Sequence, residues 1–88
     1  MRESKVEENF RKSIEAEGGA AYKFVSPNHN KVPDRIVLMP IPPKDQGIVA
    51  KYFRFVELKA PGKKPDKGQL REHKRLRKLG FTVEVIDE

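Results

Sequence analysis

The C-terminal half of the sequence places a strand pattern, a helix pattern and a second strand pattern in direct succession. Residues 48–59, IVAKYFRFVELK, form the longest predicted strand, and the Pro- and Gly-containing segment APGKKPDKG ends it. Residues 69–80 predict a helix with a thin stripe of leucines that ends at Gly80, and residues 81–87 alternate as a last strand. Because a helix between two strands is typical of a parallel crossover, we expect a parallel strand pair within a mixed sheet.

The N-terminal half adds one helix and two strands. Residues 3–19 predict a helix, since apolar residues recur every four positions and two glycines follow. Strand patterns occupy residues 20–26 and 34–40, and the proline-rich residues 41–47 predict a turn. The expected order is therefore α-β-β-β-α-β, an α/β fold in which helices flank a mixed sheet.

The two middle strands, 34–40 and 48–59, are joined across that proline-rich turn. We expect them to be antiparallel neighbours in the sheet. In that arrangement the start of one strand lies beside the end of the other.

Length and composition limit what kind of protein this is. With 88 residues and no internal repeat or linker, the chain is expected to form one domain over residues 1–88. There is no cysteine, which excludes a disulfide framework, a thiolate zinc site and a thiol nucleophile. No apolar run approaches the length of a membrane span and no signal-peptide pattern is present, so we expect a cytoplasmic protein.

The positive charge of the chain is concentrated in one segment. The net charge is +6, and residues 61–80 hold eight Lys and Arg against Asp66 and Glu72, a local balance of 8 − 2 = +6. Such a segment is typical of proteins that bind polyanions, nucleic acid first. The alternative is a solvated helix face that only keeps the protein soluble.

A carboxylate and an ammonium group occur together at the end of the longest strand. Side chains alternate on a strand, so Glu57 and Lys59 share a face; they either pair with each other or do chemistry. Asp34 begins the preceding strand, straight after Pro33. If these strands are antiparallel neighbours, Asp34 lies near Glu57, and two such carboxylates repel unless a cation lies between them. We then expect Mg²⁺ or Mn²⁺, with Lys59 beside the metal.

The segments VPDRIVLMP, FVELKAPGKKP and QLREHKRLRKLGF carry a resemblance to a known family. A Pro-Asp pair followed by Glu-x-Lys at a strand end resembles the PD-(D/E)xK nuclease superfamily, and these segments look more narrowly like its VRR-NUC family. The similarity runs from the first helix to the last strand. It implies a restriction-endonuclease-like core.

The resemblance also implies roles for individual residues. Asp34 and Glu57 match the two metal-binding carboxylates of the family, and the backbone carbonyl of Leu58 matches a position that often completes the metal shell. Lys59 matches the catalytic lysine. Gln69, at the start of the second predicted helix, matches a glutamine near the family's active site.

The family also places a glutamate of the first helix at the active site, and three residues compete for that position. Glu7 is favoured by its spacing from the glycines that end the helix; Glu3, one turn earlier on the same face, and Glu8 remain alternatives. His73 lies on the same helix face as Gln69, four residues on, and receives no assigned role.

The function implied by the resemblance is metal-dependent cleavage of DNA. Proteins similar to this one look like homodimers from bacteria or phage-infected cells that use Mg²⁺ or Mn²⁺ to cleave branched DNA such as Holliday junctions. No organic cofactor is implied. The residues expected to line the path of the DNA backbone are Lys63, Lys64, Lys67, Arg71, Lys74 and Arg75.

Two alternatives stay open. One is a non-catalytic basic module that binds nucleic acid and whose carboxylates are structural. The other is a nuclease of the same fold that acts on another DNA structure, such as a flap.

Overall fold

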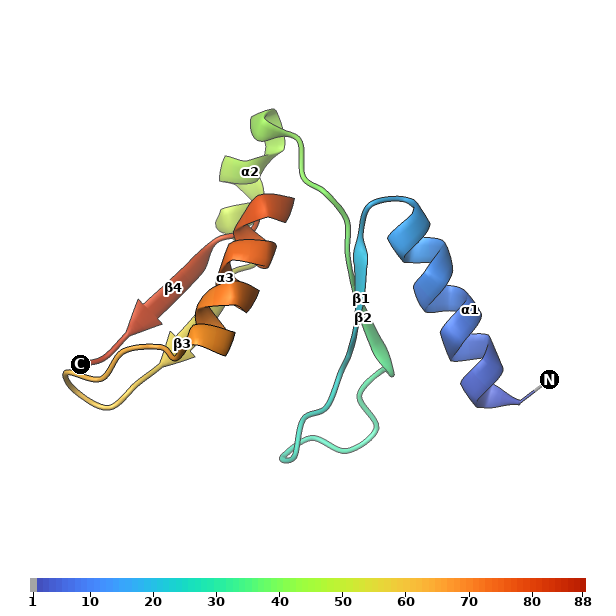
Figure 1. The fold of residues 1–88 in the computed structure, drawn as a ribbon, viewed down its shortest axis with the longest axis horizontal. Coiled ribbons are helices and arrows are strands. Elements are labelled where there is room, and N and C mark those ends of the chain that lie inside the picture. Colours follow the sequence, from blue (N-terminus) through green and yellow to red (C-terminus); the bar gives the residue numbers. More distant parts are fainter. Residues whose placement is uncertain (1) are drawn as a thin grey trace. The chain divides into compact units, whose positions relative to one another are not determined.

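Residues 2–88 are described by the computed structural model of the chain, and they form three helices and four short strands (Figure 1). The chain divides into two compact units, one that ends at Pro40 and one from Ile41 to Glu88. In chain order the elements are α1 (Glu3–Ala16), β1 (Ala20–Lys23), β2 (Arg35–Leu38), α2 (Pro43–Ala50), β3 (Phe55–Leu58), α3 (Lys67–Leu79) and β4 (Val83–Ile86). The first three belong to the first unit and the last four to the second.

The first unit consists of α1 and a two-stranded antiparallel sheet. Helix α1 forms where the sequence predicts it and ends before Gly18, whose left-handed φ of 87° turns the chain toward β1. β1 pairs with β2 so that Ala20 lies opposite Leu38 and Lys23 opposite Arg35. Helix α1 packs against β1. Ala20 and Leu38 are buried at the centre of this unit.

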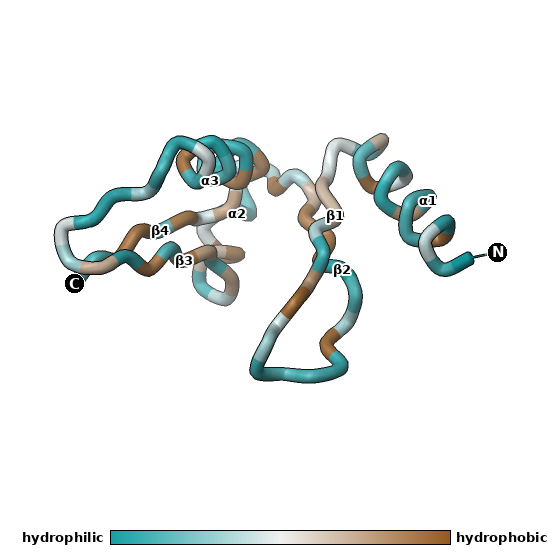
Figure 2. The backbone as a smooth tube through the Cα atoms, turned by 60° about the horizontal axis from the view of Figure 1, so that its bottom comes forward, coloured by the Kyte–Doolittle hydropathy of each residue, from teal (hydrophilic) through white to brown (hydrophobic). Residues whose placement is uncertain are grey.

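The second unit is built on the parallel pairing of β3 with β4. Phe55 lies opposite Val83 and Leu58 opposite Ile86, with α3 as the connection between the two strands. The predicted parallel pair is therefore confirmed. Leu76 of α3 and Val83 of β4 are buried where the helix meets the sheet. In Figure 2 the hydrophilic colouring of α3 contrasts with the hydrophobic stretches of β4.

Three aromatic rings pack together in the same unit. Phe53, Phe55 and Phe81 meet edge to face, with ring centroids 5.1 to 5.8 Å apart. This geometry is the one that aromatic quadrupoles favour. The cluster ties the start of β3 to the residues that precede β4.

The predicted strand over residues 48–59 is wrong in its first half. Helix α2 occupies Pro43–Ala50, and β3 is reduced to Phe55–Leu58. Pro42 and Pro43 stand at the helix start, where a missing N–H costs nothing, and Asp45 complements the dipole in the first turn. Prolines that predict a turn here begin a helix instead.

The antiparallel pairing predicted for the two middle strands involves residues of different units and stays a prediction. Among the described residues β2 pairs with β1, and β3 pairs with β4, in two separate two-stranded sheets. With α2 between β2 and β3, the connection is no longer the tight turn that makes consecutive strands a hairpin.

The mixed α/β class of the fold is as expected. Its order has one more helix than the predicted α-β-β-β-α-β, and the restriction-endonuclease-like core stays a prediction. Within residues 2–88, no helix has the length and apolar character needed to cross a membrane.

We predict that Gly80→Ala destabilises the second unit. Gly80 caps α3 with a φ of 105°, and an added Cβ would lie 2.9 Å from Gln46 Nε2 and 3.1 Å from the carbonyl oxygen of Ile41. The positive φ and the crowding should together lower the free energy of unfolding by about 1–3 kcal/mol, measured by urea denaturation.

Gly47→Ala is the matched control. Gly47 lies inside α2 with no atom within 4 Å of an added Cβ, so alanine should stabilise the chain by up to about 1 kcal/mol. Equal effects of the two substitutions would contradict this account of Gly80.

Candidate functional site

The Glu-x-Lys pair lies at the end of β3, on its more buried face. Phe55, Glu57 and Lys59 are half-buried, whereas Val56 and Leu58 are exposed. The alternation expected of this strand is thus observed. The backbone N–H of Lys59 still donates to Ile86 of β4 at 2.9 Å, so Lys59 continues the line of the strand.

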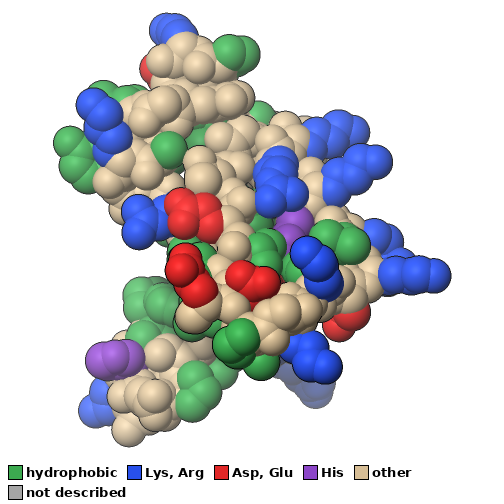
Figure 3. Space-filling view, turned by 90° about the vertical axis from the view of Figure 1, so that its left-hand side faces the viewer, with side chains coloured by type: hydrophobic (Ala, Val, Ile, Leu, Met, Phe, Trp, Pro, Cys, Tyr) green, Lys and Arg blue, Asp and Glu red, His purple; other side chains and the backbone are tan. Residues whose placement is uncertain are grey.

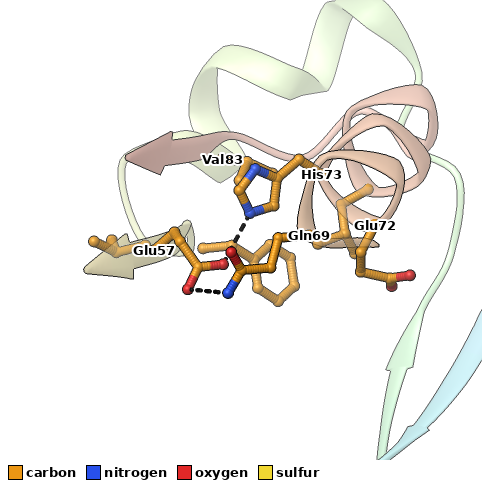
Figure 4. Close-up of a pocket in the computed structure, with 8 residues that line it drawn as sticks. Glu57, Gln69, Glu72, His73 and Val83 are labelled. Atoms are coloured by element: carbon orange, nitrogen blue, oxygen red, sulfur yellow. Dashed lines mark hydrogen bonds and ion pairs between the residues drawn. The ribbon is translucent and has the colours of Figure 1, made fainter. Parts of the chain in front are cut away.

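The Glu57 carboxylate is held by two side chains of α3. Gln69 Nε2 donates to Glu57 Oε2 at 3.3 Å, and His73 Nε2 lies 3.1 Å from Glu57 Oε1. Figure 4 shows both side chains pointing from the helix toward the strand. The Glu57 side chain is 27% exposed and that of His73 is 6% exposed, so one edge of the carboxylate remains open to solvent.

The start of α3 explains why Gln69 faces the strand. Asp66 caps the helix: its side chain accepts from the backbone N–H of Gln69 at 2.8 Å, while its own N–H donates to Gln69 Oε1 at 3.0 Å. This capping box fixes the orientation of the Gln69 amide. The amide nitrogen is then left to meet Glu57.

These side chains line a small pocket in the second unit. Its volume is about 230 Å³, below the roughly 300 Å³ at which pockets for drug-sized ligands begin. The residues around it are Phe55, Val56, Glu57, Gln69, Glu72, His73, Leu76 and Val83.

His73 is the residue of this site that the sequence did not assign. Gln69 and His73 are four residues apart on α3 and therefore share a face. The sequence signal for a role of His73 was its place on the same helix face as Gln69, three residues before the buried Leu76.

The backbone carbonyl of Leu58 is directed away from β4. In a parallel ladder every second residue bonds to a given neighbour; the amide of Phe55 donates to Thr82, just before β4, and that of Lys59 donates to Ile86 of β4. The peptide group of Leu58, between them, therefore points to the opposite edge of β3. A carbonyl in that position is available as an oxygen ligand.

The first unit holds the other predicted carboxylates. Glu3, Glu7 and Asp34 line one hollow together with Lys23. Glu7 lies 3.6 Å from Arg35 Nε, with only 17% of the Arg35 side chain exposed. The first-helix glutamate favoured by the sequence thus lies beside the residue that follows Asp34.

Glu8 instead pairs with two exposed lysines of the same helix. Lys12 Nζ lies 2.9 Å from Glu8 Oε1, and Lys5 Nζ lies 3.7 Å from Oε2. The hydrogen bond and charge of Lys12 lower the pKa of the Glu8 carboxyl. Of the three glutamates considered, Glu3 and Glu7 line the hollow that Asp34 also lines, and Glu8 does not.

The structure brings the predicted site residues together in two groups. Asp34 and Glu7 belong to the first unit, and Glu57, Lys59 and Gln69 to the second. No cluster of three or more Asp, Glu or His side chains able to hold a metal is found within residues 2–88.

The six basic residues assigned to DNA are all exposed. They lie on α3 and on the segment that precedes it, and Figure 3 shows several Lys and Arg side chains projecting into solvent. Their ends are therefore accessible to a phosphate backbone. They are Lys63, Lys64, Lys67, Arg71, Lys74 and Arg75.

Fold and site together define a small basic α/β protein with a held carboxylate and a lysine at a strand end. The chain belongs to the family of a phage protein, named "Putative nuclease p44", of Acyrthosiphon pisum secondary endosymbiont phage 1. The two are 46% identical over 87 residues, which cover 99% of this chain and 84% of the phage protein. No family model matches the sequence, and no solved structure matches it. Membership of the VRR-NUC family stays a prediction.

We predict that Glu7→Ala lowers the free energy of unfolding by about 1 kcal/mol, because it leaves the largely buried Arg35 guanidinium without its carboxylate. Glu8→Ala, one residue along the same helix, removes only exposed ion pairs and should leave the unfolding midpoint unchanged. Thermal unfolding followed by circular dichroism compares the two. A larger loss from the Glu8 substitution would refute the assigned role of the Glu7–Arg35 pair.

Proposed function

We propose that this protein is a metal-dependent DNA endonuclease that hydrolyses phosphodiester bonds and prefers branched DNA. The observation that carries the proposal is the end of β3. There Glu57 is held by Gln69 and His73, two residues before Lys59 on the same face. The name of the phage relative, which describes a nuclease, supports the same class of activity.

In this proposal Asp34 and Glu57 hold one divalent cation, Mg²⁺ or Mn²⁺. The carbonyl of Leu58 and the carboxylate of Glu7 add to that oxygen set. The support for this oxygen set is the sequence pattern Pro-Asp followed by Glu-x-Lys. When bound, such a cation lowers the pKa of a water and withdraws charge from a phosphate oxygen.

Lys59 and Gln69 act on the reacting groups. The Lys59 ammonium, beside Glu57, neutralises charge that develops on the scissile phosphate and orients the attacking water. Gln69 lies at the same reacting groups, because its amide donates to Glu57. Both residues are half-buried, which strengthens their electrostatic effect compared with a fully solvated group.

DNA approaches along the exposed basic residues of α3 and its preceding segment. Contacts of this kind bind phosphates and carry no sequence information, so the proposal includes preference for a DNA shape. Symmetric cleavage of a four-way junction requires two active sites related by a two-fold axis, and we therefore propose a homodimer.

The competing function is a basic module that binds nucleic acid without cleaving it. The exposed lysines and arginines alone would suit that role. A module of that kind has no need of carboxylates near the path of a polyanion, because they repel it. The carboxylate that α3 holds at the end of β3 therefore favours the nuclease.

We predict that Lys59→Ala lowers the single-turnover rate of cleavage by about 100-fold or more, through loss of charge stabilisation. The assay uses a labelled four-way junction beside linear duplex, in Mn²⁺, Mg²⁺ or EDTA. Lys44→Ala, which removes an exposed lysine of α2, is the matched control and should cleave like the wild type.

Symmetric nicks that require metal and are lost with Lys59→Ala would support a dimeric junction nuclease. Binding of DNA by every variant with no cleavage in either metal would overturn the catalytic proposal in favour of the binding module. Metal-dependent cleavage of flaps in preference to junctions would retain the nuclease and reject the proposed substrate.

We predict that Lys67→Ala and Lys74→Ala each reduce the salt dependence of DNA binding. If each side chain neutralises one phosphate, the slope of log affinity against log salt concentration falls by about 0.9 per substitution. Fluorescence anisotropy with labelled duplex over a series of salt concentrations gives the slope. Lys44→Ala should leave the slope unchanged. If Lys67→Ala and Lys74→Ala also leave it unchanged, the DNA does not bind along these two lysines.

A further inference from the structure

We infer that His73 is a positioning residue that fixes the Glu57 carboxylate for cation binding. The inference rests on the proposed function and assigns a role to a residue outside the set of ligands and catalytic groups. His73 is 5% exposed, and among the described residues it is the only polar or charged residue that is buried.

Burial of an imidazole in this place is costly for a unit with so small a core. His73 is buried beside the apolar Leu76 and Val83, where a leucine would remove more apolar surface from water. A buried polar ring requires a hydrogen bond to offset its desolvation. The contact of its Nε2 with Glu57 is the hydrogen bond found for this side chain.

The direction of that bond follows from its acceptor, the Glu57 carboxylate. His73 Nδ1 is buried and has no hydrogen-bond partner. A carboxylate oxygen only accepts, so Nε2 carries a hydrogen and donates it to Glu57. The ring thus acts as a single donor aimed at one oxygen.

Together with Gln69, this donor restrains both oxygens of the carboxylate. Oε1 accepts from His73 and Oε2 accepts from Gln69, which fixes the plane of the group on β3 (Figure 4). Each oxygen retains a second lone pair for a cation or its waters. Donors that orient a ligating carboxylate in this way typically change metal affinity by about 10–100-fold.

The test compares His73→Gln with His73→Met. The two side chains have similar length and shape, but only glutamine places an N–H donor near the position of the imidazole Nε2. Mn²⁺ is titrated calorimetrically into wild type and variants, and thermal unfolding is recorded with and without Mn²⁺. His73→Leu serves as a second apolar variant if the methionine protein does not fold.

We expect His73→Met to bind Mn²⁺ about 10–100-fold more weakly than the wild type, while His73→Gln retains most of the affinity. The metal-free melting temperature should change little with methionine, because the Glu57 side chain is 27% exposed and water can replace the lost donor. A role confined to packing would instead change the melting temperature and leave Mn²⁺ affinity unchanged, which would overturn the inference.

Two further outcomes separate this inference from the proposed function. If the wild type binds Mn²⁺ and cleaves DNA while His73→Met binds Mn²⁺ equally well, the nuclease stands and the positioning role fails. If the wild type binds no Mn²⁺, both fail.

Discussion

The parallel ladder between β3 and β4 is the constraint on which the candidate site depends. Parallel neighbours cannot be joined by a tight turn, so the chain must cross over, and α3 is that crossover. The crossing brings the first turns of α3 to the end of β3, where Glu57 lies. Asp66 then fixes where the helix begins, which decides that Gln69 and His73, and not their neighbours, face the strand.

In each unit a glutamate lies beside a nitrogen-bearing side chain that is largely buried. Glu7 lies against Arg35 in the first unit and Glu57 against His73 in the second. The cores around them are small: Ala20 and Leu38 are buried in one unit, Leu76 and Val83 in the other.

Local sequence patterns predicted most of the elements and the parallel pairing of β3 with β4. The four-residue apolar period identified α1, the leucines identified α3, and strand–helix–strand succession predicted the parallel pair. Helix α2 was missed because Pro42 and Pro43 suit a turn and a helix start equally well. The resemblance placed Gln69 near the site of Glu57, and the two side chains are hydrogen-bonded. The contact with His73 depends on the distance between helix and strand, which no periodicity encodes.

The two ends of the Gln69 amide have different partners, and this restricts which residues can replace it. Its oxygen accepts from the Asp66 backbone and its nitrogen donates to Glu57. Glutamate serves equally well at the third position of a capping box in most helices, but here it would set a second negative charge against Glu57. Alanine would keep neither bond. Substitution of Gln69 is therefore restricted by two requirements of different physical origin. One is the start of α3 and the other is the hydrogen bond to the Glu57 carboxylate.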